Sequence, residues 1–211
     1  MTLEIRSDSL RDGEPIPERY AVATPTPEGR AEMAGADVSP HLAWSGEPEG
    51  TRSFAISVVD PDVPADRTRM GVEGLVLGDD EPRVAFAHWL VTDIPPDVHE
   101  IAEGAASDGF EAHGKPPERA GGVGVVGQNG YRGLFEGNPD LEGTYLGWDG
   151  PFPPWNDERV HHYVFTVHAL DVPSLGLARG FGLEEFRRAI QGHELDAGSF
   201  VPVYTLNPKL R

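Results

Sequence analysis

Cysteine is absent from the 211-residue chain. Its absence excludes disulfides, thiolate nucleophiles and metal sites built from cysteine. Basic residues are scarce too, since 17 Lys and Arg stand against 35 Asp and Glu and give a formal net charge of −18. Only Lys115 and Lys209 are lysines. A continuous basic surface is therefore not expected, and neither nucleic acid nor a membrane surface is a predicted partner.

Long apolar runs are also lacking. No stretch approaches the roughly 18 consecutive apolar residues that a membrane-spanning helix needs. The N-terminal residues MTLEIRSDSLRDGEP carry acids where a secretory signal peptide has bases followed by an apolar run. These two observations predict a cytoplasmic protein without stable membrane insertion.

The excess of acidic residues favours a protein kept soluble in concentrated salt, because salt screens the self-repulsion of an acidic surface. The alternative is an ordinary acidic protein from a GC-rich genome, in which arginine replaces lysine. For a salt-adapted protein we expect the melting temperature to rise from low salt to molar KCl. A melting temperature that stays constant or falls over that range contradicts salt adaptation.

Glycine and proline are abundant, with 26 and 20 residues. This content exceeds what a helical bundle tolerates and predicts many short strands joined by loops. The apolar fraction of 38% is sufficient for a hydrophobic core. We therefore expect a mainly β protein with a single domain over residues 1–211.

Three segments have the composition of β-strands that end at proline-containing turns, namely 53–60, 87–94 and 161–170. The first, SFAISVVD, is a continuous apolar run, which is typical of a strand buried on both faces. Alternation over 3–5 indicates a short edge strand. Only 183–191, LEEFRRAIQ, has the spacing of a good amphipathic helix. The lack of helices between the strands argues against a parallel βαβ fold.

Two connections, 66–84 and 103–150, are long and rich in glycine and charged residues. Loops of this length are often functional, so a lid over a site or a contact between two copies of the chain is one interpretation. A solvated loop is the other. A homodimer thus stays among the predicted partners.

Chemically active side chains gather near the ends of the predicted strands. Asp60 ends the first strand and Asp62 follows in a turn that contains two prolines, and His88 lies in the second strand. His161 and Tyr163, two residues apart, share a face of the third. An imidazolium beside a carboxylate, with a tyrosine hydroxyl and glycine-loop N–H groups, suits a phosphate or a carboxylate. We predict a pocket for a small anionic ligand, in which Asp60 orients and charges the histidine.

Other interpretations of these residues stay open. Taken singly, each residue type is more often structural than functional. Together they allow a hydrolase with Asp60 or Asp62 and His88 as general acid and base. They also allow a zinc site, although the Asp-x-Asp and His-x-Tyr pairs match no metal signature, or a regulator that binds proteins and no longer uses its pocket. Because no nucleophile–base pair has a recognisable spacing, anion binding without a cofactor is favoured.

Longer motifs carry a resemblance to a known family. The runs SPHLAWSGEPEGTRSFAISVVDPDVP (39–64), AHWLVTDIPP (87–96), GPFPP (150–154) and HHYVFTVHALD (161–171) resemble, in the same order, the phosphatidylethanolamine-binding protein family. They are most similar to its prokaryotic, Raf-kinase-inhibitor-like branch. The segments DGEPIPERY and GHELDAG extend the resemblance over nearly the whole chain.

The resemblance implies a Greek-key β fold of two antiparallel sheets with a few short helices, one of them near the C-terminus. It also implies a ligand-binding or regulatory protein, with no catalytic mechanism to carry over. His41 and His162 depart from the family pattern, which usually has proline and arginine there, so positive charge near the pocket is expected to be lower at neutral pH. The pocket implied by the matching motifs consists of Asp60, Asp62, His88, Gly150, Pro151, His161 and Tyr163.

Overall fold

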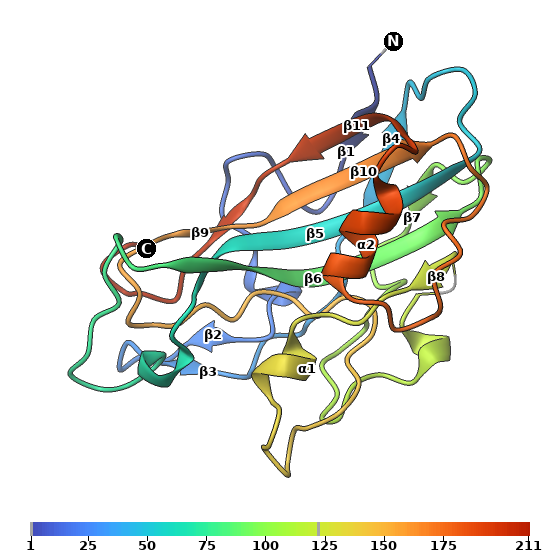
Figure 1. Cartoon of the computed structure of the whole chain (residues 1–211). Coiled ribbons are helices and arrows are strands. Elements are labelled where there is room, and N and C mark those ends of the chain that lie inside the picture. The colour runs from blue at the N-terminus through green and yellow to red at the C-terminus, as the bar shows by residue number, and fades with distance from the viewer. Residues whose placement is uncertain (1, 122) are drawn as a thin grey trace.

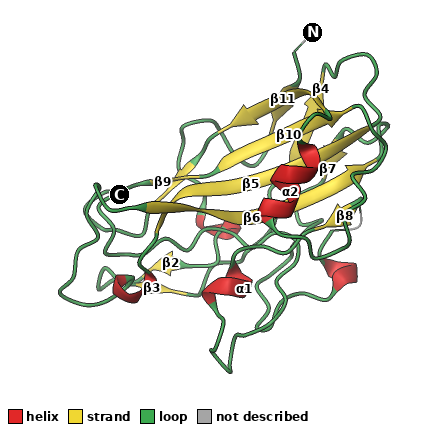
Figure 2. Cartoon of the chain, viewed as in Figure 1, coloured by secondary structure: helices red, strands yellow, loops and turns green. Residues whose placement is uncertain are grey.

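The protein is built mainly from β-strands joined by long loops (Figures 1 and 2). The computed structural model describes residues 2–121 and 123–211. The strands are β1 (Glu4–Arg6), β2 (Thr24–Pro25), β3 (Ala31–Glu32), β4 (Leu42–Ser45), β5 (Ser53–Pro64), β6 (Arg83–Ile94), β7 (Glu100–Ile101), β8 (Val125–Val126), β9 (His161–His162), β10 (Val164–Leu170), β11 (Glu194–Phe200) and β12 (Val203–Tyr204). The helices among these residues are α1 (Tyr131–Leu134), α2 (Leu183–Ile190) and short 3-10 turns at Glu18–Tyr20, Arg67–Arg69 and Pro117–Arg119. The predicted mainly β fold is confirmed.

The largest sheet contains five antiparallel strands in the order β11-β10-β5-β6-β8. Within this sheet β5, β6 and β8 follow one another along the chain, and β10 returns after a long connection to pair with β5. Three successive strands with a fourth beside the first form a Greek key. The topology implied by the resemblance is thus present, and it places residues from distant parts of the sequence side by side.

The main hydrophobic core lies between this sheet and a second antiparallel sheet in the order β1-β4-β7. Trp44 from β4 packs edge-on against Phe54 from β5, with ring centroids 5.5 Å apart. Phe165 and Val167 from β10 belong to the same cluster. The two predicted sheets correspond to these two, and the structure adds the small ribbons β2-β3 and β12-β9.

Helix α2 covers the other face of the five-stranded sheet (Figure 1). Its Phe186 joins Ala55 of β5 and Leu90 of β6 in an apolar cluster. Phe54 and Ile56, the neighbours of Ala55, belong to the core between the sheets. Successive residues of β5 therefore face opposite layers, which explains its uninterrupted apolar run. The predicted doubly buried strand and the predicted amphipathic helix are both confirmed.

Strand β5 is longer than predicted. It does not end in a turn at Asp60, because Asp60, Val63 and Pro64 still pair with β6 across an irregularity in the register. Asp60 is consequently held within a strand instead of projecting from a loop. The segment 161–170 also differs from the prediction, since β9 pairs with β12 whereas β10 pairs with β5 and β11.

The two long connections contain short elements of their own. The first includes a 3-10 turn and ends in the opening residues of β6, and the second contains β8 and α1. Met70 from the first connection and Leu134 from the second line the same cavity. The loops therefore form part of the candidate site.

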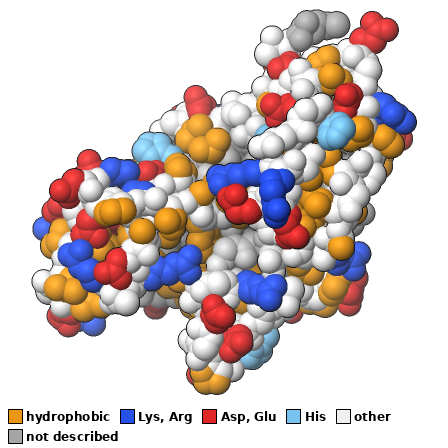
Figure 3. Space-filling view, in the orientation of Figure 1, with side chains coloured by type: hydrophobic (Ala, Val, Ile, Leu, Met, Phe, Trp, Pro, Cys, Tyr) orange, Lys and Arg blue, Asp and Glu red, His pale blue; other side chains and the backbone are white. Residues whose placement is uncertain are grey.

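Charged side chains are mixed over the visible surface. On the face shown in Figure 3, lysine and arginine side chains lie beside aspartate and glutamate, without a continuous basic surface. Exposed Arg187 and Arg188 of α2, for example, share the helix with exposed Glu184 and Glu185. No helix in the described part of the chain combines the length and the apolar character needed to cross a bilayer.

Candidate ligand-binding site

Side chains from β5, β6, β9 and the two long connections surround a small cavity. The cavity volume that the centres of water molecules can occupy is about 20 Å³. This is room for about one or two ordered waters. The polar lining residues are Asp60, His88, Tyr131, His161 and Tyr163. The apolar lining residues are Val63, Met70, Phe86, Leu134, Phe152, Pro153 and Pro154. The structure thus brings Asp60, His88, His161 and Tyr163 together and leaves Asp62, Gly150 and Pro151 outside the lining.

His88 reaches the cavity from β6 and is buried. Its Nδ1 lies 2.7 Å from the carbonyl oxygen of Asp149, and because a carbonyl only accepts hydrogen bonds, this contact assigns a hydrogen to Nδ1. Burial lowers the pKa of His88, and the charge of Asp60 opposes this only in part. His88 is therefore a neutral imidazole at neutral pH, whereas its place beside Asp60 in the predicted pocket favours an imidazolium.

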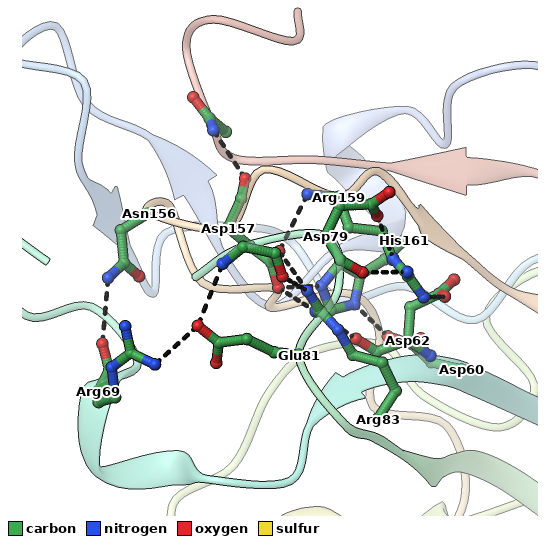
Figure 4. A network of polar contacts seen from close by, with 12 residues as sticks. Asp60, Asp62, Arg69, Asp79, Glu81, Arg83, Asn156, Asp157, Arg159 and His161 are labelled. Carbon is green, nitrogen blue, oxygen red and sulfur yellow. Dashed lines mark hydrogen bonds and ion pairs between the residues drawn. The ribbon is translucent and has the colours of Figure 1, made fainter. Parts of the chain in front are cut away.

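His161 is the centre of a chain of buried charges (Figure 4). Its Nδ1 lies 2.6 Å from Oδ2 of Asp60, and its Nε2 lies 3.2 Å from Oδ2 of Asp157. Arg83 donates to both oxygens of Asp157, over 2.5 and 3.0 Å. Carboxylate, imidazolium, carboxylate and guanidinium alternate along this chain, so each charge has an opposite neighbour.

The contacts of His161 fix both its charge and its role. Burial alone would lower the pKa of His161, but the charges and hydrogen bonds of Asp60 and Asp157 outweigh it and raise the pKa to about 9. Both ring nitrogens are engaged by carboxylates, so neither N–H is available to a ligand. The expectation that His161 donates to an anion is corrected: the residue holds Asp60 and Asp157 in place.

Tyr163 lies at the junction of β9 and β10 and is buried beside His88, with ring centroids 5.1 Å apart. Its hydroxyl has no hydrogen-bond partner among residues 2–121 and 123–211. Burial, followed by the charge of Asp60, raises the pKa of Tyr163 well above its usual value, so the hydroxyl keeps its proton. A buried hydroxyl without a partner costs about 1–3 kcal/mol, and Tyr163 is one of the residues that line the cavity.

Asp62 takes part in a separate cluster beside the cavity. Its Oδ2 accepts the backbone N–H of His162 at 3.0 Å and lies 2.8 Å from the Nδ1 of the same residue. Its Oδ1 lies 3.2 Å from Arg159. Burial would raise the pKa of Asp62, but these contacts outweigh it and lower the pKa. The backbone N–H of Asp62 donates to Oδ1 of Asp60 at 2.7 Å, so Asp62 supports the orientation of Asp60.

Gly150 and Pro151 are not among the residues that line the cavity. The N–H of Gly150 donates to Oδ1 of Asp37 at 2.8 Å, so it is not the free loop donor that the sequence analysis expected. A Cβ at Gly150 would lie 1.9 Å from the carbonyl oxygen of Tyr20, which explains why only glycine fits there. The carbonyl of Pro151 accepts two backbone N–H groups from the segment 22–23. These contacts anchor the loop whose next residues, 152–154, line the cavity.

A second buried ionic cluster lies behind His88. Lys115 Nζ contacts the carboxylate of Asp149 and lies 3.3 Å from Oδ2 of Asp37. The backbone carbonyl of Asp149 accepts from His88, and the carboxylate of Asp37 accepts from Gly150. The cluster therefore holds the loop that fixes the ring of His88.

Three residues that sequence reasoning missed support the site. Asp157 lies four residues before His161 but within a loop. In a loop, a spacing of four residues does not predict that two side chains meet. Arg83 lies within the predicted long connection 66–84, where no strand is expected to fix its position. One feature of the sequence could have drawn attention to Lys115, because it is one of only two lysines in a strongly acidic chain.

The fold and the cavity define a class of protein: a two-sheet, Greek-key β protein with a small cavity beside β5, β6 and β9. Residues 6–205 match the sequence model of the family described as phosphatidylethanolamine-binding protein. The chain belongs to this family of ligand-binding proteins, which confirms the resemblance found in the motifs.

Relatives place the chain in the prokaryotic branch. It is 30% identical over 202 residues to a UPF0098 protein of Aquifex aeolicus (strain VF5). The aligned residues cover 96% of this chain and 88% of that relative. It is 28% identical to UPF0098 protein YbhB of Escherichia coli (strain K12), over 96% of this chain and all of YbhB. The crystal structure of E. coli YbcL, described as a new member of the mammalian PEBP family, superposes with a TM-score of 0.69 at 23% identity and covers 97% of this chain and 99% of YbcL. This last similarity shows the shared fold.

Proposed function

We propose that the chain binds a small molecule whose phosphate or carboxylate group occupies the cavity beside Tyr163. The observation that carries the proposal is the buried Tyr163 hydroxyl without a partner in the described residues, because such a group in a native protein calls for a ligand or an ordered water. The family description, phosphatidylethanolamine-binding protein, supports a phosphorylated ligand. No cofactor is needed for this role.

The remainder of the ligand would lie in a larger hollow that adjoins the cavity. Both are lined by Met70, Leu134 and residues 152–154, and the hollow adds Phe135 and Trp155. About 270 Å³ of the hollow is open to the centres of water-sized molecules. A small polar end and a wider apolar region suit a ligand with an anionic head and an apolar body.

The proposed role is to carry or to sense such a ligand, which is consistent with the regulatory role implied by the resemblance. A cytoplasmic location and a second copy of the chain as partner stay predictions of the sequence. The hydrolase alternative, with Asp60 or Asp62 and His88 as general acid and base, also stays a prediction of the sequence. Within the ranges that the structure describes, no group of three or more His, Asp or Glu side chains is arranged to hold a metal ion.

Replacing Tyr163 by phenylalanine tests the proposal. We expect the affinity for methyl phosphate, measured by isothermal titration calorimetry, to fall by about tenfold or more, because a hydrogen bond to a charged group is lost. We expect the free energy of unfolding of the unliganded protein to stay equal or to rise by up to about 1 kcal/mol, since the variant no longer buries an unpaired hydroxyl.

Tyr204→Phe is the matched control. The Tyr204 hydroxyl is also buried, but it donates to the carbonyl of Ala23 at 2.9 Å and does not line the cavity. Its removal should cost about 1 kcal/mol of stability and leave the affinity unchanged. Undiminished affinity in Tyr163→Phe, or a loss of stability as large as that of the control, would refute the proposed role of Tyr163.

A further inference from the structure

We propose that the site selects an anionic group that carries its own proton, such as the monoanion of a phosphomonoester, over an anion of the same shape without one, such as a sulfate ester. The proposal rests on the proposed function and adds the ionisation state of the group that is bound. It follows from the hydrogen-bonding capacity of the groups that face the cavity.

Asp60 presents a carboxylate to the cavity. Its Oδ1 accepts the N–H of Asp62 at 2.7 Å, and its Oδ2 pairs with Nδ1 of His161 at 2.6 Å. Each carboxylate oxygen has a further lone pair, and neither has a hydrogen to donate. An anionic oxygen of a ligand and a carboxylate oxygen of Asp60 repel each other at contact distance. An anion can therefore bind against Asp60 only when a proton lies between these two oxygens.

His88 adds a second acceptor. Because Nδ1 donates to the carbonyl of Asp149, the neutral ring has its lone pair on Nε2, which can accept a hydrogen bond. Turning this nitrogen into a donor means charging a buried imidazole, which burial disfavours. A ligand that brings a hydrogen avoids that cost.

The nearby cations are already paired. Arg83 forms a two-pronged contact with Asp157, and His161 lies between Asp157 and Asp60, so the formal charges of these four residues cancel. Lys115 is bound to two carboxylates behind His88. The titratable groups that face or support His88 are Asp37, Asp60, Lys115, Tyr131, Asp149, His161 and Tyr163.

Among the described residues, the cavity therefore offers a ligand one donor, the Tyr163 hydroxyl, and two acceptors, the Asp60 carboxylate and Nε2 of His88. The Tyr163 hydroxyl can donate to a P–O oxygen, while the hydroxyl hydrogen of a phosphate monoanion can donate to Asp60 or to Nε2 of His88. A sulfate ester has the same tetrahedral shape and the same single charge, but it has no hydrogen near neutral pH. Comparing the two ligands isolates the contribution of that hydrogen.

The experiment is calorimetric titration of the full-length protein with methyl phosphate and with methyl sulfate, at about pH 5.5 and about pH 8. At the lower pH we expect methyl phosphate to bind at least about tenfold more tightly than methyl sulfate, because the sulfate leaves one acceptor facing an anion without a hydrogen. From the lower to the higher pH we expect methyl phosphate to lose about 50- to 100-fold in affinity, because its second ionisation lies near pH 6. His161, with a pKa of about 9, stays charged over this range.

A variant gives a second readout. Asp60→Asn keeps the shape of the side chain but adds an amide donor, so methyl sulfate should bind this variant within about threefold of methyl phosphate. Urea unfolding establishes that the variant is folded. If the variant does not fold, the comparison of methyl phosphate with methyl sulfate on the unaltered protein tests the inference by itself.

The outcomes separate this inference from the proposed function. Equal binding of both anions, or phosphate binding that does not weaken as the pH rises, overturns the inference and leaves the anion site standing. Binding of neither anion at the lower pH overturns the proposed function. Binding of methylammonium in place of both anions overturns both, because it would make the acceptors a cation site.

Discussion

Replacing Lys115 by methionine is expected to lower the free energy of unfolding by about 3–5 kcal/mol, because it leaves two buried carboxylates without their counter-ion. Lys115 is 3% exposed, and Asp37 and Asp149 are 0% and 1% exposed. Burial raises the pKa of both carboxyl groups, whereas their charges outweigh burial at Lys115 and raise its pKa. Urea unfolding followed by tryptophan fluorescence measures the loss.

Two controls isolate the ionic part of that loss. Lys209, the other lysine of the chain, is exposed, and Lys209→Met should change stability by less than about 0.5 kcal/mol. Adding Asp37→Asn and Asp149→Asn to Lys115→Met should recover part of the stability, since no unpaired charge is then buried. A cost below about 1 kcal/mol for Lys115→Met would show that the cluster does not hold the loop behind His88.

Part of the cavity lining could be predicted, because strand composition places its residues. The apolar run of β5 points to Asp60 at its far end, and the alternation of a strand puts His161 and Tyr163 on one side. All three side chains line the cavity. The Greek key, which the family motifs imply, brings β5 and β10 together across a long stretch of sequence.

The chemistry of the site could not be predicted, because it depends on the partner of each polar atom. Nothing in the spacing shows that Nε2 of His161 meets Asp157, whose position depends on the conformation of a loop. The neutral state of His88 follows from burial and from one backbone carbonyl, that of Asp149. The motif containing Gly150 predicts a free N–H donor, yet that N–H donates to Asp37 and the close approach of Tyr20 is what requires glycine there.

Replacing His161 by glutamine is expected to cost about 3–5 kcal/mol at about pH 6, because Asp60 and Asp157 lose the cation between them. Glutamine can retain one hydrogen bond but carries no charge. The matched control is His193→Gln, since His193 pairs with Asp171 at the surface, where the two side chains are 43% and 45% exposed. We expect this control to lose no more than about 1 kcal/mol.

The pH dependence of the free energy of unfolding tests whether the charge on His161 is the cause of this stabilisation. Its pKa is about 9 in the folded protein, against about 6.5 in an unfolded chain, so protonation stabilises the fold below pH 6.5 and this stabilisation is lost as the pH rises through 9. The difference amounts to about 3 kcal/mol in the free energy of unfolding. We therefore expect the stability of the unaltered protein to fall between about pH 6.5 and pH 9.5, and that of His161→Gln to change little over the same range. Parallel profiles for the two proteins would mean that His161 is neutral in the fold, and the ionic chain from Asp60 to Arg83 would then lack its central cation.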